Sequence, residues 1–589
     1  MYKSLLSYAG IPVLGIASQW LSWRLKVPSI LVLLISGFIV GPVLNLIKPT
    51  ELLGNTLFPI VSLSVAVILF EGGLSLKILD LKHSGKVVSS LITTGVFLSW
   101  GLISLAAVFI LDLDYNVSLI LGAILVVTGP TVIIPLLRHI NLKRSISSIL
   151  RWEGITIDPV GASLAVVVFD VVIAESAADL FGVVLVVVTS TLLAGFILGS
   201  VGAGILMLIL NRRWLPEYLQ EAVTLMLVFG IYAVSDVIQS ESGLLSVTIM
   251  GIVLANQSLV TIKHIITFKE NLSVLLLSSL FIILAANVQL ADLKDLLHVE
   301  TLAFVLVLIF FVRPFSVWVC TIGTKLPIRE RIFLAFLAPR GIVAAAVSSL
   351  FSIKLIQAGM PQAKELVPIT FLVIVVTVVF YGLIGMPLAK FLKLQQDHRS
   401  FLAVGAQRWV REMAKTLRRF NIDMVLVDTS KENILAAKDD DLKTIQGSIL
   451  SGKVMDEIEL GGFGRLLAVT PSDEVNVLAT TEYMEVFEEA SLFRLQPNDK
   501  SKSLFSNFQH GRYLFSKGAT STYLEARITA GAKFVSEKIA RDYPMEKVYA
   551  RYKNVIPFFL ITPQKKLRIF NQSTPLNPAP GDRVICLVS

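Results

Sequence analysis

Thirteen apolar runs between residues 4 and 391, separated by short polar loops, most constrain the fold of this chain of 589 residues. A helix needs about 20 apolar residues to cross a bilayer, and each run has roughly that length. Only 16% of the residues are charged, against roughly 25% in soluble proteins, and the deficit lies mostly before residue 395. We therefore predict a polytopic α-helical membrane protein with about thirteen transmembrane helices, followed by ordinary soluble sequence.

The charges in the loops alternate along the chain. Loops rich in Lys and Arg, such as the one with Lys77 and Lys86, alternate with acidic loops, such as the one with Asp112 and Asp114. Because basic loops stay in the cytoplasm, we predict an inner or plasma membrane protein with its N-terminus outside and its C-terminus cytoplasmic. The net charge of +9 then reflects topology, so no nucleic-acid partner is expected, and two cysteines give no metal cluster.

Two carboxylates interrupt the apolar run that starts near residue 149. Glu153 and Asp158 are five residues apart, so they project about 140° apart on a helix. A charge at membrane depth is costly and usually has a partner or a function. We predict that one carboxylate faces a protein partner and the other, Asp158, faces an ion path. The alternative is that both are structural charges.

Two other runs contain helix-breaking residues. Thr128-Gly129-Pro130 lies in the fifth run and Pro339-Arg340-Gly341 in the twelfth. If the membrane part consists of two repeats of six spans, these breaks occupy matching positions. Interrupted helices at matching positions indicate a midplane binding site in a secondary transporter, whereas harmless kinks are the alternative.

Two further charges lie in apolar runs. Glu71, in the cytoplasmic half of the third run, is either an ion-path group or an acid that reaches the membrane interface. Arg313, followed by Pro314, is interpreted as a supporting charge that neutralises an acid or holds an unwound carbonyl.

Beyond a short polar linker, Gln395 to Ser400, strands alternate with helices, which predicts a parallel α/β sheet. Asp428 ends the second predicted strand, the position that holds a ribose in dinucleotide-binding folds. Only Gly405 remains of the glycine fingerprint, and Arg408 and Trp409 are expected to crowd a pyrophosphate.

In combination, these motifs resemble the monovalent cation:proton antiporters of the NhaP/NHE branch over residues 1–395. The resemblance implies inverted repeats, crossed discontinuous helices, a homodimer in membrane lipid, an essential aspartate at Asp158, and a structural ion pair between Glu153 and Arg340. We expect Thr128, Gly129 and Glu71 to join Asp158 as ion and proton ligands.

The soluble part resembles an RCK (TrkA-like) regulatory module. The resemblance implies a Rossmann-like subdomain at 400–510 and a small α+β subdomain at 511–589. Gly405, Arg408 and Asp428 are the candidate residues for a regulatory nucleotide. No cofactor is required, and no metal is expected other than the transported cation.

The chain departs from the antiporter pattern at three positions. Gly129 replaces an aspartate, Ile157 an asparagine and Gly154 a serine. These changes favour a larger, weakly hydrated cation such as K⁺, or coordination by backbone carbonyls. We predict an antiporter that exchanges Na⁺ or K⁺ for H⁺ and is not an enzyme; the alternatives are an RCK-gated potassium channel and a sensor that has lost transport.

Overall fold

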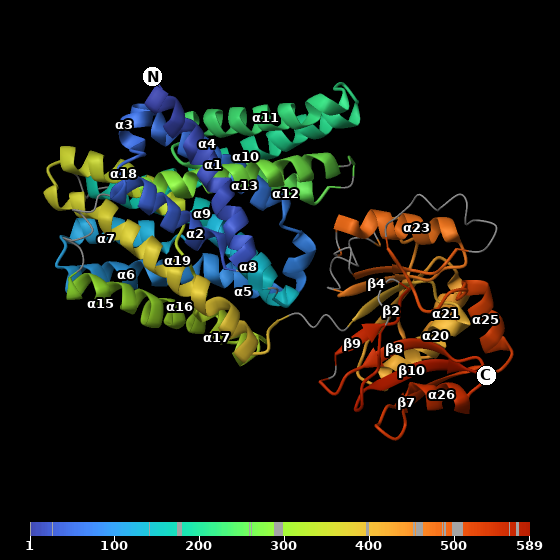
Figure 1. Ribbon diagram of the computed structural model, residues 1–589. Helices are drawn as coiled ribbons and strands as arrows, with labels where there is room; N and C mark the ends of the chain where they lie inside the picture. The colour runs from blue at the N-terminus through green and yellow to red at the C-terminus, as the bar shows by residue number, and fades with distance from the viewer. Residues whose placement is uncertain are drawn as a thin grey trace. The chain divides into compact units, whose positions relative to one another are not determined.

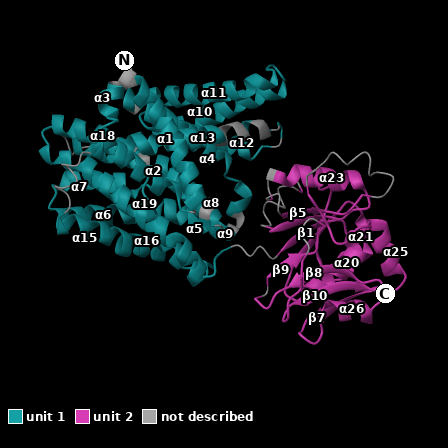
Figure 2. Cartoon of the chain, in the orientation of Figure 1, with its two compact units in different colours: residues 1–395 teal, residues 396–589 magenta. Residues whose placement is uncertain are grey.

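The computed structural model consists of two compact units, residues 1–395 and 396–589, which Figure 2 colours separately. It describes residues 2–589 except 26, 141, 174–179, 258, 261, 288–297, 396–399, 452–453, 455–462, 486, 488–490, 498–510, 565 and 573–575. Most of the predicted linker therefore lies outside the described residues. Each unit is described separately below.

Unit 1 is a bundle of helices (Figure 1). Its helices are α1 (Tyr2–Leu25), α2 (Ser29–Phe38), α3 (Pro49–Leu53), α4 (Leu57–Leu74), α5 (Leu81–Ile92), α6 (Thr94–Leu111), α7 (Tyr115–Val126), α8 (Pro130–Ile140), α9 (Arg144–Ile173), α10 (Leu180–Asn211), α11 (Glu217–Ile238), α12 (Ser242–Ala255), α13 (Lys263–Ala286), α15 (Val299–Val307), α16 (Arg313–Cys320), α17 (Ile328–Ala335), α18 (Ile342–Gln357) and α19 (Leu366–Phe391).

The apolar runs of the sequence account for these helices. Within the described residues, seven helical segments are long and apolar enough to cross a membrane, and five more apolar helices are shorter. The polytopic helical fold is thus confirmed, while the number of thirteen spans stays a prediction. A π-helical segment, Leu308–Val312, leads directly into α16 and Arg313. Such π-helical turns occur often at functional sites.

Unit 2 contains two sheets flanked by helices (Figure 1). Its elements are β1 (Phe401–Val404), α20 (Arg408–Arg418), β2 (Met424–Asp428), α21 (Lys431–Asp439), β3 (Lys443–Gln446), β4 (Arg465–Ala468), α23 (Asp473–Glu482), β5 (Leu492–Arg494), β6 (Arg512–Tyr513), α25 (Ser521–Thr529), β7 (Lys533–Lys538), α26 (Met545–Arg551), β8 (Ile556–Ile561), β9 (Leu567–Ile569) and β10 (Arg583–Val588).

The first sheet has the order β3-β2-β1-β4-β5-β6, with every pair parallel. This is the order of dinucleotide-binding folds, in which ligands bind at the carboxyl ends of the central strands. The predicted Rossmann-like sheet is therefore confirmed. The second sheet, β7-β10-β8-β9, is antiparallel. Because β6 pairs with β5, the first sheet continues just past the predicted subdomain boundary at residue 511.

Candidate functional site

The two helix breaks predicted from the sequence cross each other inside unit 1. Residues 127–129 separate α7 from α8, and residues 336–341 separate α17 from α18. The backbone N–H of Gly129 donates to the carbonyl of Pro339 at 3.1 Å. A Cβ atom placed on Gly129 would lie 2.2 Å from the Cα of Gly341. The backbones of the two interrupted segments are thus in direct contact, and neither glycine has room for a side chain.

Arg340 lies within this crossing and is almost fully buried. Its Nη1 donates to the carbonyl oxygen of Val126 at 2.9 Å and to that of Val127 at 3.4 Å. These carbonyls lie at the C-terminal end of α7, where free carbonyl groups give the helix a partial negative charge. The guanidinium group therefore neutralises the broken end of α7 and satisfies its backbone.

Asp158 of α9 faces the same crossing. Gly154, Asp158 and Gly161 share one face of α9, because positions three and four apart are neighbours on a helix. A Cβ atom on Gly161 would meet the side chain of Val127 at 2.3 Å, and one on Gly154 would meet Ile133 at 2.9 Å. Since Asp158 lies between these two contacts, its carboxylate is level with the break between α7 and α8.

Several oxygens around this point have no hydrogen-bond partner among the described residues. Asp158 is 0% exposed, and neither of its carboxylate oxygens has a hydrogen-bond partner in the described part of the chain. The hydroxyl groups of Thr128 and Thr131 are likewise buried and unpartnered there. Buried polar atoms are almost always paired, so three such groups around one helix break are available to a ligand. Asp158, Thr128 and Thr131 are therefore the candidate ligands for a desolvated cation or a proton.

Thr131 was missed by the sequence analysis. It follows the predicted Thr-Gly-Pro break directly, and the signal was its place in the first turn of α8, where side chains lie beside the break. Gly129 is part of the site only through its backbone. Glu71 lies partly buried in the last turn of α4 and makes interactions with other residues, but it is not bonded to Asp158.

The predicted ion pair between Glu153 and Arg340 is wrong. Both oxygens of Glu153 accept from Arg313, whose Nη1 and Nη2 lie 2.5 Å and 2.9 Å away. Arg313 also donates from Nε to the carbonyl of Leu334 at 3.3 Å. Arg313 thus neutralises an acid, which is one of the two roles predicted for it. Arg340 instead holds the carbonyls of an unwound segment.

In unit 2, the candidate nucleotide residues gather at the carboxyl ends of β1 and β2. Asp428 accepts from the backbone N–H of Ala406 at 2.8 Å, from that of Ser430 at 2.8 Å and from the amide of Asn433 at 3.0 Å. Gly405 has a φ of 117°, in the region that favours glycine. The carboxylate of Asp428 thus holds the two loops at this edge together.

The N-terminus of α20 lies at the same edge. The backbone N–H of Trp409 donates to a carboxylate oxygen of Glu525, from α25, at 3.2 Å. Arg408 is exposed. Trp409 does not crowd this position, contrary to the prediction: it is 0% exposed and packs edge-to-face against Phe515 and Phe558. The apolar indole packs into the core, and Glu525 occupies the position that a phosphate takes in dinucleotide-binding folds.

A cleft of about 620 Å³ opens beside Glu525. It is lined by Gln407, Pro471, Ser521, Thr522 and further residues of α25. Small-molecule sites typically have volumes of about 300–1,000 Å³. The cleft therefore has room for a small ligand at the carboxyl edge of the sheet.

The sequence of this chain matches two known families. Residues 11–391 match the family described as sodium/hydrogen exchanger, transmembrane. The chain belongs to the sodium/hydrogen exchanger family. In this exchanger, residues 401–505 match the TrkA-N domain, which confirms the regulatory module.

Several known antiporters are similar in sequence to this chain. The chain is 28% identical to the K⁺/H⁺ antiporter NhaP of Alkalimonas amylolytica over 391 residues, or 66% of each chain. It is 26% identical to Na⁺/H⁺ antiporter 1 of Methanocaldococcus jannaschii, over 60% of this chain and 84% of that one. It is 25% identical to the K⁺/H⁺ antiporter NhaP2 of Shewanella sp. ANA-3, over 61% of this chain and 62% of that one.

The chain thus spans about two-thirds of the length of the K⁺/H⁺ antiporters it matches. The solved structure of the sodium proton antiporter MjNhaP1 from Methanocaldococcus jannaschii at pH 8 superposes with a TM-score of 0.57 at 24% identity. The superposition covers 66% of the present chain and 99% of the MjNhaP1 chain. This likeness confirms the antiporter fold.

Proposed function

We propose that this chain is a secondary antiporter that exchanges a monovalent cation, Na⁺ or K⁺, for protons by alternating access. The observation that carries the proposal is the fully buried, unpartnered carboxylate of Asp158 at the crossed helix breaks. Such breaks at membrane depth occur where backbone lines a binding site. The relatives named as Na⁺/H⁺ and K⁺/H⁺ antiporters support the same reaction class.

Competition at Asp158 couples the two ions. Burial disfavours an ionised carboxylate, while a bound cation favours it, so the site holds either a proton or a cation. Each form is neutral, which lowers the cost of moving the loaded site across the membrane. One titrating carboxylate gives one proton per cation, an electroneutral exchange. Thr128, Thr131 and the backbone near Gly129 supply further oxygens.

Gly129 supports a site with few charged ligands. An aspartate at this position, as in the resembling antiporters, would collide with the backbone of Gly341. The site therefore relies on hydroxyl and carbonyl oxygens around one carboxylate, which suits a weakly hydrated cation such as K⁺. Ile157 points to another face of α9, where it lines a small cavity with Arg313 and Arg340.

The loop charges and the resemblance to the NhaP branch also support a membrane topology and an assembly. The basic loops support a topology with the C-terminal unit in the cytoplasm and the N-terminus outside. The resemblance to the NhaP branch favours a homodimer in the inner or plasma membrane. The domain limits that we propose are 1–395 for the exchanger, 400–510 for the Rossmann-like subdomain and 511–589 for the smaller subdomain.

We infer that the C-terminal unit regulates transport by binding a small ligand at the carboxyl edge of its parallel sheet, with an adenine nucleotide as the candidate. Asp428 lies at the carboxyl end of β2, where a ribose is held in related folds, and the exposed Arg408 is available to a phosphate. A ligand that binds the two transport states differently shifts their populations.

Transport in proteoliposomes tests the proposal. Wild-type protein should acidify or alkalinise the lumen when a Na⁺ or K⁺ gradient is applied, without a membrane current. The Asp158→Asn variant should lose exchange while keeping its thermal unfolding midpoint. Glu217→Gln, at an exposed position in the first turn of α11, is the matched control and should transport normally.

Three outcomes would contradict the proposal. Cation flux without proton movement would indicate a channel, although the chain has no TVGYG-type filter. No flux from wild-type protein would indicate a sensor. Wild-type exchange by a folded Asp158→Asn protein would remove Asp158 from the mechanism.

A further inference from the structure

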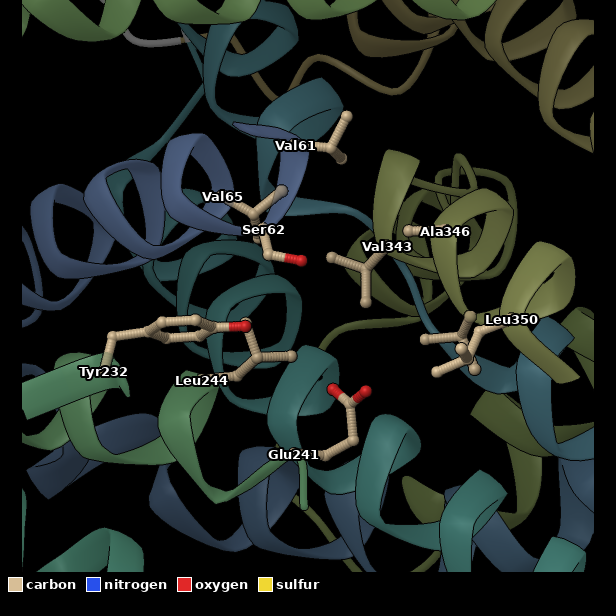
Figure 3. A pocket seen from close by; sticks show the side chains of 10 residues that line it. Val61, Ser62, Val65, Tyr232, Glu241, Leu244, Val343, Ala346 and Leu350 are labelled. Atoms are coloured by element: carbon tan, nitrogen blue, oxygen red, sulfur yellow. The ribbon is translucent and has the colours of Figure 1, made fainter. Parts of the chain in front are cut away.

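A further cavity lies between α4, α18 and the turn that joins α11 to α12. It has a volume of about 90 Å³, enough for several water molecules. Its walls are mostly apolar side chains such as Val65 and Val343. Three oxygen-bearing side chains, those of Ser62, Tyr232 and Glu241, converge on the space from different elements (Figure 3). The cavity thus has the composition of a small polar site in an apolar wall.

This cavity lies on the side of the membrane away from residue 395. The N–H of Lys143, just before α9, donates to the carbonyl of Leu394 at 2.9 Å. The 30 residues of α9 span about 45 Å, so its last turns reach the opposite side. There Phe169 stacks on Phe351 of α18 with ring centroids 4.5 Å apart. Lys354 of α18 lies 5.4 Å above the ring of Phe169 and interacts electrostatically with Glu241.

The backbone fixes the direction of Glu241. Its φ of 64° is uncommon for a residue other than glycine. Its backbone N–H donates to a carboxylate oxygen of Asp236 at 2.8 Å, which stabilises this conformation. The side chain then points into the cavity (Figure 3), and no residue in the described part of the chain forms a hydrogen bond or an ion pair with its carboxylate.

The charged groups around Glu241 come from three helices. Asp236 and Tyr232 belong to α11, Lys354 to α18, and Asp170 of α9 lies within the electrostatic reach of Lys354. The residues of α4 that line the cavity, Val61, Ser62 and Val65, carry no charge. Burial and then the neighbouring Asp236 carboxylate raise the pKa of Glu241 to about 7, while Lys354 acts in the opposite direction. Glu241 therefore changes charge near neutral pH.

We propose that Glu241, with Tyr232 and Ser62, forms a second site that takes either a proton or a partly hydrated monovalent cation at the outer mouth of the exchange path. This inference rests on the proposed function. Carboxylate and hydroxyl oxygens suit monovalent cations, and acidic groups at a pore mouth raise the local cation concentration. Because α18 begins at the crossed breaks and also lines the cavity, the site adjoins the path to Asp158.

Transport measured separately from each side tests this site. For cation added on the side of the membrane opposite residue 395, the apparent KM of the wild-type protein should fall several-fold as the pH on that side rises through about 7. Glu241→Gln should lose this transition near pH 7 and have a higher KM than the wild-type protein above pH 7, with kcat unchanged and no effect from the other side. Glu241→Asp should keep the pH dependence, and Glu217→Gln, at an exposed position on α11, is the matched control.

A chemical readout makes the test independent of transport. A carbodiimide modifies protonated carboxyl groups, so labelling of Glu241, followed by mass spectrometry, should decline above pH 7 and with added NaCl or KCl. Choline chloride at equal ionic strength should not protect, and an Asp158→Asn background should leave the protection intact. The proposal would be overturned if the labelling of Glu241 changed with neither pH nor added cation. It would also be overturned if Glu241→Gln had the KM of the wild-type protein, even if exchange itself is confirmed.

Discussion

Glu153 of α9 and Arg313 of α16 form a two-point ion pair inside the helix bundle, although 160 residues separate them in the sequence. The side chains are 1% and 7% exposed. Two parallel N–H···O bonds fix the relative position of the two helices, because the guanidinium fork matches a carboxylate in one geometry. The pair thus holds α9, which carries Asp158, against the second half of the bundle.

Breaking this pair should destabilise the fold. Glu153→Gln and Arg313→Gln each leave one charge buried without its partner, which typically costs about 3–5 kcal/mol. The double variant should lose less stability than the sum of the two single variants. Denaturant titration in mixed micelles measures the free energies of unfolding for this double-mutant cycle.

Two controls make the result specific. Arg329→Gln, at an exposed position on α17, should change the free energy of unfolding little. A cycle between Glu153 and Arg340 should give a much smaller coupling, since Arg340 donates to backbone carbonyls. Strong coupling to Arg340 and none to Arg313 would contradict the structure.

The contact between Gly129 and Gly341 makes a second prediction. A Cβ atom on Gly341 would lie 2.4 Å from the Cα of Gly129, so Gly341→Ala forces the crossed backbones apart. Such overpacking typically costs about 1–3 kcal/mol. We expect a lower thermal unfolding midpoint and loss of exchange. Gly204→Ala in α10, where a Cβ atom meets nothing within 4 Å, is the matched control and should be tolerated; normal transport by Gly341→Ala would show that the breaks are not tightly crossed.

Arg340 supports the broken end of α7. Arg340→Gln removes the charge opposite the carbonyls of Val126 and Val127 and should misplace the neighbouring Thr128. We expect a several-fold higher apparent KM for the cation in the exchange assay. Arg340→Lys keeps the charge and should lie between wild type and Arg340→Gln. An unchanged KM in a stable Arg340→Gln protein would show that the end of α7 does not depend on this group.

Local sequence patterns predicted the elements of the site. Gly and Pro marked both breaks, because these residues interrupt helices wherever they occur. Two isolated acids in an apolar run identified α9, and short apolar runs located β1 and β2. These predictions succeeded since each depends on a few neighbouring residues.

Partner choice between distant segments was not predictable in the same way. Arg313 and Arg340 have the same side chain. The helical period predicts the side of the helix on which a residue lies, but not which other segment packs against that side. The contact between Trp409 and Glu525 joins positions 116 residues apart, which no local pattern encodes. The prediction that Trp409 crowds a pyrophosphate was wrong. It rested on the position of Trp409 shortly after Gly405, whereas the apolar surface of its side chain favours burial in the core.

Glu525 leads to the last prediction, which concerns the C-terminal unit. Its carboxylate accepts from the N–H of Trp409, at the helix start where a phosphate would bind, so it competes with a nucleotide for this position. Glu525→Gln removes the competing charge and should raise the affinity for an adenine nucleotide several-fold. Calorimetry on the full-length protein in detergent, with ATP, ADP, AMP and NAD, measures the change. Glu546→Gln, at an exposed position in α26, is the matched control. Equal affinities for wild type and Glu525→Gln would show that the nucleotide does not reach the start of α20, and no binding by either protein would exclude nucleotide regulation through this edge.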